Sequence, residues 1–297
     1  MKTTRILILG LFAALGTLLM PACTDDSASV PSFVEVTAFK VVDSPSSSVS
    51  RYEGCFTSDI NAVEITVKTS TENELVGVFE LPCRVPILKE GKCDIVLKPA
   101  IKLNGISATR SAYPFYTDAI IKNVNLVPDS VIVIDTQSVT YTNYVNFAWT
   151  EYCERFVTNP FSPDTIVRLM TDKDSVRSDN ASAAIYMSPE QESLEFTSRD
   201  SCVVYNNDAL ILELDYWTNV PLEVGMKSKQ TSAGIEETYY SIYLYPNDGW
   251  EKIYIQLGRL WSTVFNYYDI FKIAFRVSNP DGIEAKTYID NIKLTSY

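Results

Sequence analysis

Alternating apolar and polar side chains run through much of the first half of the chain. Residues 33–39 and 63–68 place apolar side chains at every second position, which is typical of half-buried β-strands. Turn signals separate these runs, among them Asn104-Gly105 and Pro128-Asp129. Short strands at this spacing predict a small antiparallel β-sandwich, immunoglobulin-like or prealbumin-like, over residues 33–138.

A second series of alternating segments follows in the remainder of the chain. Apolar side chains occupy every second position over residues 210–216, 253–257 and 273–277. No segment shows a convincing helical period, apart from a turn near residues 261–268. We therefore predict an all-β protein whose second sandwich covers residues 139–297.

Residues 1–22 carry a different pattern. Lys2 and Arg5 precede about fifteen mostly apolar residues, 6–20, which is the size of a signal-peptide core and shorter than the ~20 residues that span a bilayer. A small residue then precedes Cys23. The segment resembles a bacterial lipoprotein signal, which implies that Cys23 is acylated and becomes the first residue of the mature protein.

Two positions depart from the usual lipoprotein pattern. Met20 and Pro21 stand where a leucine and a small residue are common, so an ordinary secretory signal or a retained anchor are the alternatives. Residues 23–32 are small and polar, as in a flexible tether. The acidic pair Asp25-Asp26 resembles the surface-export signal of Bacteroidota lipoproteins. We expect a lipid-anchored outer-membrane protein that faces either the periplasm or the cell surface.

Charge and composition narrow the functional classes. The chain has a net charge of −12, and removal of residues 1–22 leaves 37 acidic and 23 basic side chains, or −14. An acidic protein of this kind lacks the clustered basic residues that nucleic acids or anionic lipid headgroups require. Histidine is absent, which excludes serine–histidine triads, cysteine–histidine pairs and histidine-ligated zinc. Glycoside hydrolysis by paired carboxylates passes this filter.

Five cysteines lie beyond Cys23, so at least one is free or bridged to another chain. Cys83 and Cys93, separated by nine residues, either bridge neighbouring strands or remain buried thiols. No C-x-x-C sequence is present, so no thiol redox centre or cysteine-based metal site is indicated. The five are Cys55, Cys83, Cys93, Cys153 and Cys202.

Two segments of the second half resemble a known fold. The closing sequence TYIDNIKL, residues 287–294, resembles the last strand of carbohydrate-binding jelly rolls of the galactose-binding-like type. The sequence FAWTEYCE, residues 147–154, resembles the acidic first strand of the same fold, although Cys153 is not part of that pattern. The resemblance implies a jelly roll that serves lectin-like modules, adhesins and enzyme appendages, so it does not fix the function.

The first half is also similar to uncharacterised two-domain lipoproteins of Bacteroidota. The similarity rests on residues 104–110 and 113–116 and implies no activity. For Asn104-Gly105 alone, a tight turn is the simpler interpretation.

The outward faces of the C-terminal strands carry a candidate ligand site. If Leu212 and Leu214 face the core, the residues between and beyond them point outward. In residues 238–245 the face with Tyr240, Ile242 and Leu244 is the more apolar, so the opposite face is expected to be exposed. Aromatic rings beside carboxylates and amides suit sugar recognition. The alternative is that the tyrosines pack under loops or against the first domain. The predicted glycan-binding set is Glu213, Asp215, Trp217, Tyr243, Tyr245, Tyr254 and Gln256.

Asp290 is a candidate metal ligand. By alternation it shares a face with Tyr288, Ile292 and Leu294 and is partly buried, so it needs a partner. The jelly-roll resemblance implies a structural calcium held by acidic residues of the first and last strands, and the carboxylates available are Glu151, Glu154 and Asp290. The alternative is an Asp that is simply hydrogen bonded within the sheet. No other cofactor is predicted.

These patterns together predict a non-catalytic protein that binds an extracellular glycan through its second domain. The alternatives are an accessory or scaffolding subunit of a cell-envelope complex, and a glycoside hydrolase that uses carboxylates such as Glu213, Asp215 and Glu223. The expected partners are a lipid bilayer, through Cys23, and a glycan or an envelope protein. No nucleic acid is expected.

Overall fold

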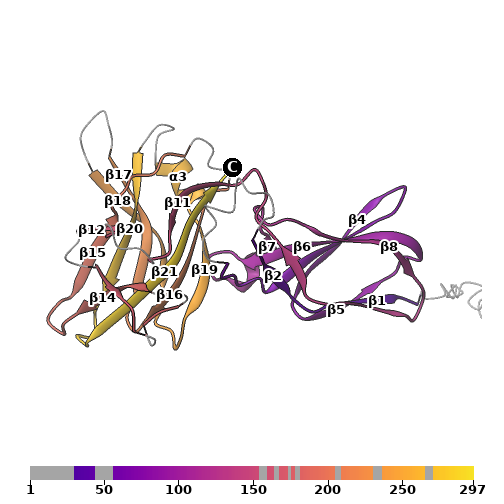
Figure 1. Cartoon of the computed structure of the whole chain (residues 1–297), viewed down its shortest axis with the longest axis horizontal. Coiled ribbons are helices and arrows are strands. Elements are labelled where there is room, and N and C mark those ends of the chain that lie inside the picture. The colour runs from indigo at the N-terminus through magenta and orange to yellow at the C-terminus, as the bar shows by residue number, and fades with distance from the viewer. Residues whose placement is uncertain are drawn as a thin grey trace, which may run out of the picture.

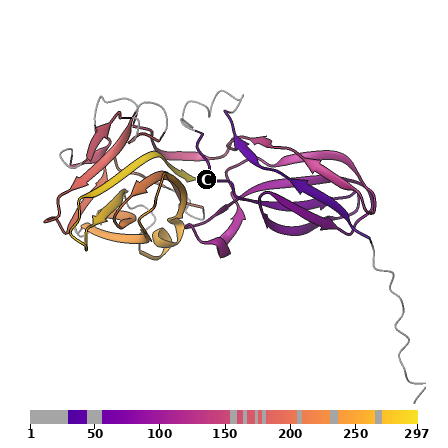
Figure 2. The same cartoon turned by 90° about the horizontal axis from the view of Figure 1, so that it is seen from below.

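The computed structural model describes residues 30–43, 56–153, 159–163, 167–172, 175–177, 181–204, 209–229, 236–264 and 270–297. The described chain is nearly all β, which confirms the predicted fold class. Its helical elements are the short α3 (Gly258–Val264) and one turn of 3-10 helix, η1 (Ser107–Thr109). Figures 1 and 2 show two sandwiches side by side, with the C-terminus at their junction. None of the described helices is long and apolar enough to cross a membrane.

The first sandwich packs one five-stranded sheet against two smaller sheets. The larger sheet runs β4 (Asn73–Glu80), β3 (Ala62–Lys68), β6 (Gly91–Lys102) and β7 (Arg110–Ala112), with β8 (Ala119–Leu126) also on β6. The smaller sheets are β5 (Cys83–Ile87), β1 (Ser32–Val36) and β9 (Val131–Ile134), and β10 (Gln137–Val139) with β2 (Phe39–Val41). The predicted alternation holds in β3, where Val63, Ile65 and Val67 are fully buried.

The second sandwich is a jelly roll of two antiparallel sheets. The six-stranded sheet runs β13 (Val167–Met170), β14 (Ser182–Met187), β21 (Ala285–Ser296), β16 (Ile211–Thr218) and β19 (Glu251–Gln256), and β11 (Asn146–Glu151) also pairs with β21. The five-stranded sheet runs β12 (Phe161–Ser162), β15 (Ser193–Ser198), β20 (Ile270–Ser278), β17 (Leu222–Lys229) and β18 (Glu236–Leu244).

The core of the second sandwich lies between these sheets. Leu212 and Leu214 of β16 are fully buried there, as the alternation predicted. Phe196 of β15 and Phe275 of β20 stack with their ring centroids 5.0 Å apart, and Phe161 meets both rings edge-on. Burial of such aromatic side chains is a large part of the stabilisation of a sandwich.

The described cysteines are free thiols. Cys83 lies on β5 and Cys93 on β6, in different sheets, and they are not bridged. Cys93 is buried, so the buried-thiol alternative is confirmed for it, whereas Cys83 is half-buried; Cys153 and Cys202 are buried as well. Burial raises the pKa of Cys202 to about 12, which keeps it protonated. Cys55 lies outside the described residues, as do Cys23 and the predicted signal segment.

A tight turn of the first sandwich binds the open edge of β19 in the second. Asn104 and Gly105 both have positive φ, 55° and 69°, and the backbone N–H of Ile106 donates to the carbonyl of Leu103. The predicted turn is therefore confirmed. The backbone N–H of Asn104 donates to the carbonyl of Tyr254 over 2.8 Å, and Asn104 Oδ1 accepts the N–H of Gln256 over 2.9 Å. These bonds satisfy edge groups of β19 and fix the angle between the sandwiches.

A buried carboxylate lies at the centre of the junction. Glu213, on the outer face of β16, is fully buried. It accepts hydrogen bonds from Tyr113 Oη at 2.5 Å and from Tyr141 Oη at 2.9 and 3.0 Å, both from the first sandwich. The ammonium of Lys252 lies 3.6 Å from the same carboxylate and is also buried. The first sandwich thus supplies hydroxyl donors to a charge of the second.

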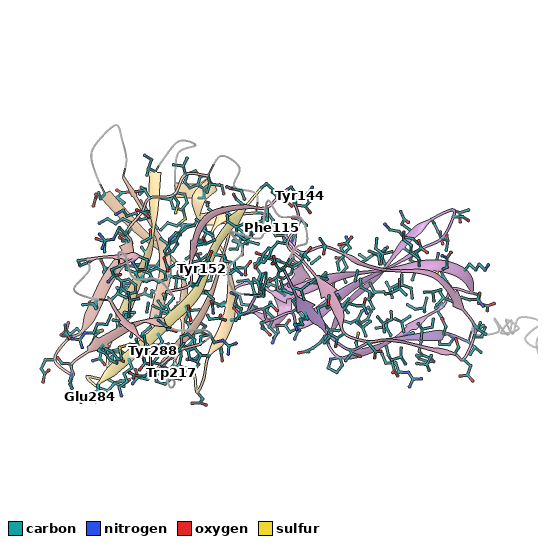
Figure 3. The ribbon with its side chains drawn as sticks, viewed as in Figure 1. Phe115, Tyr144, Tyr152, Trp217, Glu284 and Tyr288 are labelled. Atoms are coloured by element: carbon teal, nitrogen blue, oxygen red, sulfur yellow. The ribbon has the colours of Figure 1, made fainter. Side chains whose placement is uncertain are left out.

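Further buried groups extend this junction cluster. Lys293 Nζ lies 3.2 Å from Tyr141 Oη, and the hydroxyls of Tyr116 and Tyr254 are 3.1 Å apart. Burial raises the pKa of Tyr113, Tyr116, Tyr141 and Tyr254 well above its ordinary value, so all four remain neutral hydrogen donors. Phe115 and Tyr144, labelled in Figure 3, lie beside the cluster and each contacts the ring of Tyr297.

We predict that Glu213→Ala strongly destabilises the protein. Removal of the carboxylate takes the ion-pair partner from the buried ammonium of Lys252, which costs about 3–5 kcal/mol in comparable pairs. Denaturant unfolding of the purified protein measures the loss. The control is Glu284→Ala, because Glu284 is an exposed carboxylate at the far end of the second sandwich (Figure 3). A free energy of unfolding that changes equally little in both variants would contradict the assigned role of Glu213.

Candidate functional site

A cleft of about 540 Å³ lies on the outer face of the five-stranded sheet. This volume falls within the usual range of small-ligand sites. The cleft combines carboxylates, ammonium groups, hydroxyls and an aromatic ring over a small apolar floor. Its principal lining residues are Glu195, Thr197, Lys227, Glu236, Thr238, Tyr240, Lys272 and Ala274.

Strand pairing arranges the outer face of this sheet in three rows. The first row runs Lys272, Lys227 and Thr238; the second Thr197, Ala274, Gly225 and Tyr240; and the third Glu195, Arg276, Glu223 and Tyr243. The rows follow from the alternation of each strand, since Met226 of β17 and Phe275 of β20, which lie between these positions, are buried in the core. Polar side chains from four strands therefore meet on one face.

Arg276 organises the third row. Its Nη2 donates to Glu223 Oε1 over 2.6 Å, its Nε donates to the other Glu223 oxygen, and its Nη1 lies 3.7 Å from Glu195 Oε1. The guanidinium carbon lies 4.4 Å from the centroid of the Tyr240 ring, in cation–π contact. The hydrogen bonds to Glu223 raise the pKa of Arg276 further, so it stays charged. A forked ion pair of this type holds all three side chains in a fixed geometry.

Tyr240 closes one side of the cleft. Burial, followed by the nearby charge of Glu195, raises the pKa of its hydroxyl, which therefore remains a neutral hydrogen donor. Lys227 pairs with Glu236 at 2.9 Å, which compensates the like charge of Lys272 directly opposite. Lys272 has no ion pair among the residues that the structure describes.

A β-bulge determines which tyrosines face the cleft. The pairing of β17 with β18 shifts between Val224 and Gly225, so one additional residue of β18, Ser241, is accommodated there. A Cβ on Gly225 would lie 2.0 Å from the carbonyl oxygen of Tyr239, so only glycine fits beside the bulge. The bulge reverses the faces expected for Tyr239 and Tyr240.

The prediction for β18 was therefore right at one end and wrong at the other. Tyr243 and Tyr245 are exposed, 45% and 73%, as predicted. Tyr240 was assigned to the core face with Ile242, but it lies on the outer face, and Tyr239 packs against the core instead. The alternation of polar and apolar residues within a single strand does not reveal that the strand contains an extra residue.

Sequence reasoning missed three charged residues as binding residues: Glu195, which lines the cleft, and Arg276 and Glu223, which lie beside it in the third row. Glu195 and Arg276 were not singled out, and Glu223 was considered only as a possible catalytic carboxylate. A signal for Arg276 existed, because residues 272, 274 and 276 are the polar or small positions that alternate with the apolar positions of β20. Their importance depends on the neighbouring strands β15 and β17, which alternation within one strand does not identify.

The predicted glycan-binding set is divided between two sheets. Tyr243 lies on the sheet that forms the cleft, whereas β16 and β19 belong to the other sheet. The expectation of an open surface was wrong for Glu213, Asp215 and Tyr254, whose exposed fractions are 0%, 0% and 1%. The first sandwich covers this face, so the alternative, that a tyrosine packs against the first domain, is confirmed for Tyr254.

The other members of the predicted set lie near the covered face. Asp215 Oδ2 accepts hydrogen bonds from Thr57 Oγ1 at 2.6 Å and from Asn291 Nδ2 at 2.8 Å. Trp217 is half-buried, and its ring centroid lies 5.2 Å from that of Tyr288; both residues are labelled in Figure 3. Gln256 is half-buried against the Asn104 turn. A role of Trp217 or Gln256 in ligand binding stays a prediction.

Asp290 lies on the outer face of β21, not on the face of Ile292 and Leu294. The pairing of β16 with β21 shifts between Glu213 and Asp215, and Asn291 has a positive φ of 50°, so a bulge separates Asp290 from the core positions that follow. The expectation of a face shared with Ile292 and Leu294 was therefore wrong, while Tyr288 does share the face of Asp290. Asp290 accepts hydrogen bonds from Ser182 Oγ at 2.9 Å and from the N–H of Asn291 at 2.8 Å.

The calcium site stays a prediction. Glu151 accepts the backbone N–H of Cys153 over 2.8 Å, and Glu154 lies outside the described residues. Asp215 lies opposite Asp290 in the strand register, so two carboxylates are close together. Within the described parts of the chain, no group of three or more His, Cys, Asp or Glu side chains is placed to hold a metal ion.

Comparison with known proteins finds structural neighbours only. No family model and no curated protein matches the chain. Among solved structures, a family 11 carbohydrate-binding module from Clostridium thermocellum, in complex with a β-1,3-1,4-mixed-linked tetrasaccharide, is 13% identical, with a TM-score of 0.36; the match covers 49% of this chain and 94% of that module. A xylan-binding domain of family 22 is 9% identical, with a TM-score of 0.35, over 52% of this chain and 96% of its own. At these levels the neighbours say nothing of the ligand.

The titration of Asp290 gives a testable pH dependence. Burial, opposed by its hydrogen bonds and assisted by the charge of Asp215, raises the pKa of Asp290 from 3.8 to about 7. Between these values the unfolded chain has released the proton while the folded protein retains it, so folding stability falls as the pH rises. Asp290→Asn removes this titration, because an amide does not exchange a proton with solvent in this way. The substitution keeps the size and shape of the side chain and its capacity to form hydrogen bonds.

We therefore expect Asp290→Asn to gain stability relative to the wild type as the pH rises from about 4 to about 8, by at most about 4 kcal/mol. Urea unfolding at several pH values, in the presence of EDTA to exclude bound calcium, measures the difference. A difference between the two proteins that is independent of pH would contradict the raised pKa.

Proposed function

We propose that the protein binds an extracellular glycan in the cleft of the five-stranded sheet. The observation that carries the proposal is the third row of this face, in which Arg276 is held between Glu223 and Glu195 and against the ring of Tyr240. Sugar hydroxyls donate and accept hydrogen bonds together, and a row of alternating carboxylates and a guanidinium offers both partners in fixed positions.

The composition of the cleft supports the same ligand class. Ala274 and Gly225 give the centre of the face a floor without long side chains, on which a flat sugar ring has room to lie. The ring of Tyr240 borders that floor and offers an apolar face to the C–H groups of a pyranose. Because acidic and basic groups are both present, the cleft does not select strongly for an ion of one sign.

The geometry of the carboxylates favours binding without catalysis. Glycoside hydrolysis places two carboxyl groups on either side of the bond to be cleaved. In the row beside this cleft, Arg276 lies between Glu195 and Glu223 and contacts both, so the two carboxylates do not flank an open space. We infer that the carboxylates orient the guanidinium and accept hydrogen bonds from the sugar.

We predict that Tyr240→Ala and Arg276→Met each weaken glycan binding at least tenfold, as loss of a central contact typically does. The panel to test is mixed-linkage β-1,3-1,4-glucan, β-1,4-galactan, mannan and xylan, by affinity electrophoresis and isothermal titration. Tyr144→Ala, a change of an exposed tyrosine outside the cleft, is the matched control.

Two outcomes would contradict this site assignment. Failure of the folded wild type to bind any glycan of the panel or of a broad glycan array would contradict the function. Loss of binding in Trp217→Ala together with unchanged binding in Tyr240→Ala would place the site on the other sheet.

We also propose that acylated Cys23 holds this glycan-binding body at the outer membrane. Cys23 lies outside the described residues, and the support is the sequence pattern before it. Cys23→Ala should release the protein from the membrane fraction into the soluble fraction, because anchoring through acyl chains is lost. Mass spectrometry of the wild-type amino terminus provides the direct test, and an unmodified Cys23 or an uncleaved signal would contradict the proposal.

A further inference from the structure

A second hollow, of about 900 Å³, lies between the two sandwiches. The first sandwich contributes Asp59, Lys102 and the Asn104-Gly105 turn. The second contributes residues 241–247, at the end of β18, and residues 250–253 at the start of β19. None of the described residues that line this interdomain groove lines the cleft on the five-stranded sheet.

We infer that the interdomain groove is a second subsite, which binds the continuation of a glycan chain held in the cleft. This inference rests on the proposed function. The link is β18: Tyr240 lines the cleft, while Tyr243 on the outer face and Tyr245, just past the end of the strand, line the groove. The path from Tyr240 to Tyr245 is ~16 Å at the usual rise of a strand, which is longer than one sugar ring.

The groove offers the two kinds of contact that a sugar chain needs. Tyr243 and Tyr245 are exposed, with their ring centroids 5.0 Å apart and one edge toward the other, and Trp250 is half-buried at the opposite end of the connecting turn. Polar groups of both signs, including Glu251 and Lys102, lie within the same hollow. Exposed aromatic faces beside hydrogen-bonding groups are suited to stacking on pyranose rings.

The walls of the groove are fixed before any ligand arrives. Asn104 is hydrogen bonded to the backbone of Tyr254 and Gln256, and the junction cluster around Glu213 lies directly behind this contact. A preformed groove spares the ligand the cost of ordering its site.

The edge of β18 also argues for a glycan over an extended peptide as the occupant. A peptide that adds to a sheet requires a regular row of free backbone groups along the edge. The bulge at Ser241 interrupts this row at the point where the cleft meets the groove, and Ser241 Oγ donates to the carbonyl of Gln256. Side chains, and not backbone groups, therefore present the recognition surface.

The experiment measures affinity against chain length. The wild type, Tyr245→Ala and Trp250→Ala are titrated with oligosaccharides, from disaccharide to octasaccharide, of whichever panel polysaccharide the wild type binds. We expect wild-type affinity to keep rising beyond the length that fills the cleft. Both variants should lose at least fivefold in affinity for the longest oligosaccharides and remain unchanged for the shortest. Tyr144→Ala, another exposed tyrosine that does not line the groove, should match the wild type at every length.

The outcomes separate this inference from the function on which it rests. If Tyr240→Ala loses binding while Tyr245→Ala and Trp250→Ala match the wild type at all lengths, the cleft binds glycan and the groove does not. A loss that is equal for short and long chains would likewise overturn the groove as an extension. If the wild type binds none of the glycans, both proposals fail.

Discussion

The arrangement of this protein depends on one buried carboxylate. Glu213 lies without solvent contact on the outer face of the second sandwich, and its hydroxyl donors, Tyr113 and Tyr141, come from the first. Separation of the sandwiches would remove the tyrosine hydroxyls from Glu213, and the hydroxyl of Tyr141 from Lys293 as well. The two domains therefore have one defined relative position, and this position determines the shape of any surface formed between them.

Two β-bulges determine which side chains this framework presents. The additional residue Ser241 turns Tyr240 outward, where it meets Arg276. The additional residue near Asn291 places Lys293 opposite Glu213 on the outer face. Asp290 lies on the same face, although the two positions are three residues apart and strict alternation would place them on opposite faces. Without the second bulge, Lys293 would point into the apolar core. Bulges of this kind re-aim side chains at the cost of a local break in pairing.

The sequence was sufficient to predict the strands. It was insufficient to predict which strands and side chains contact one another in the folded protein. The alternation around Leu212 and around Ile65 follows from local burial, and the positive φ values of Asn104 and Gly105 follow from the turn they form. The burial of Glu213 depends on Tyr113, which is 100 residues away in the chain, and no periodicity encodes that contact. The bulge at Ser241 was invisible for a related reason, since it is a property of a strand pair and not of one strand.

The error in the predicted glycan-binding set follows from the chemistry of recognition. A carboxylate beside aromatic rings accepts hydroxyl donors, and it makes no difference to the carboxylate whether a sugar or a tyrosine supplies them. On the six-stranded sheet, the first sandwich supplies them to Glu213 through Tyr113 and Tyr141. On the five-stranded sheet, the row around Arg276 has no such cover among the described residues and borders an open cleft. The same composition therefore serves domain association on one sheet and leaves the other sheet free to bind a ligand.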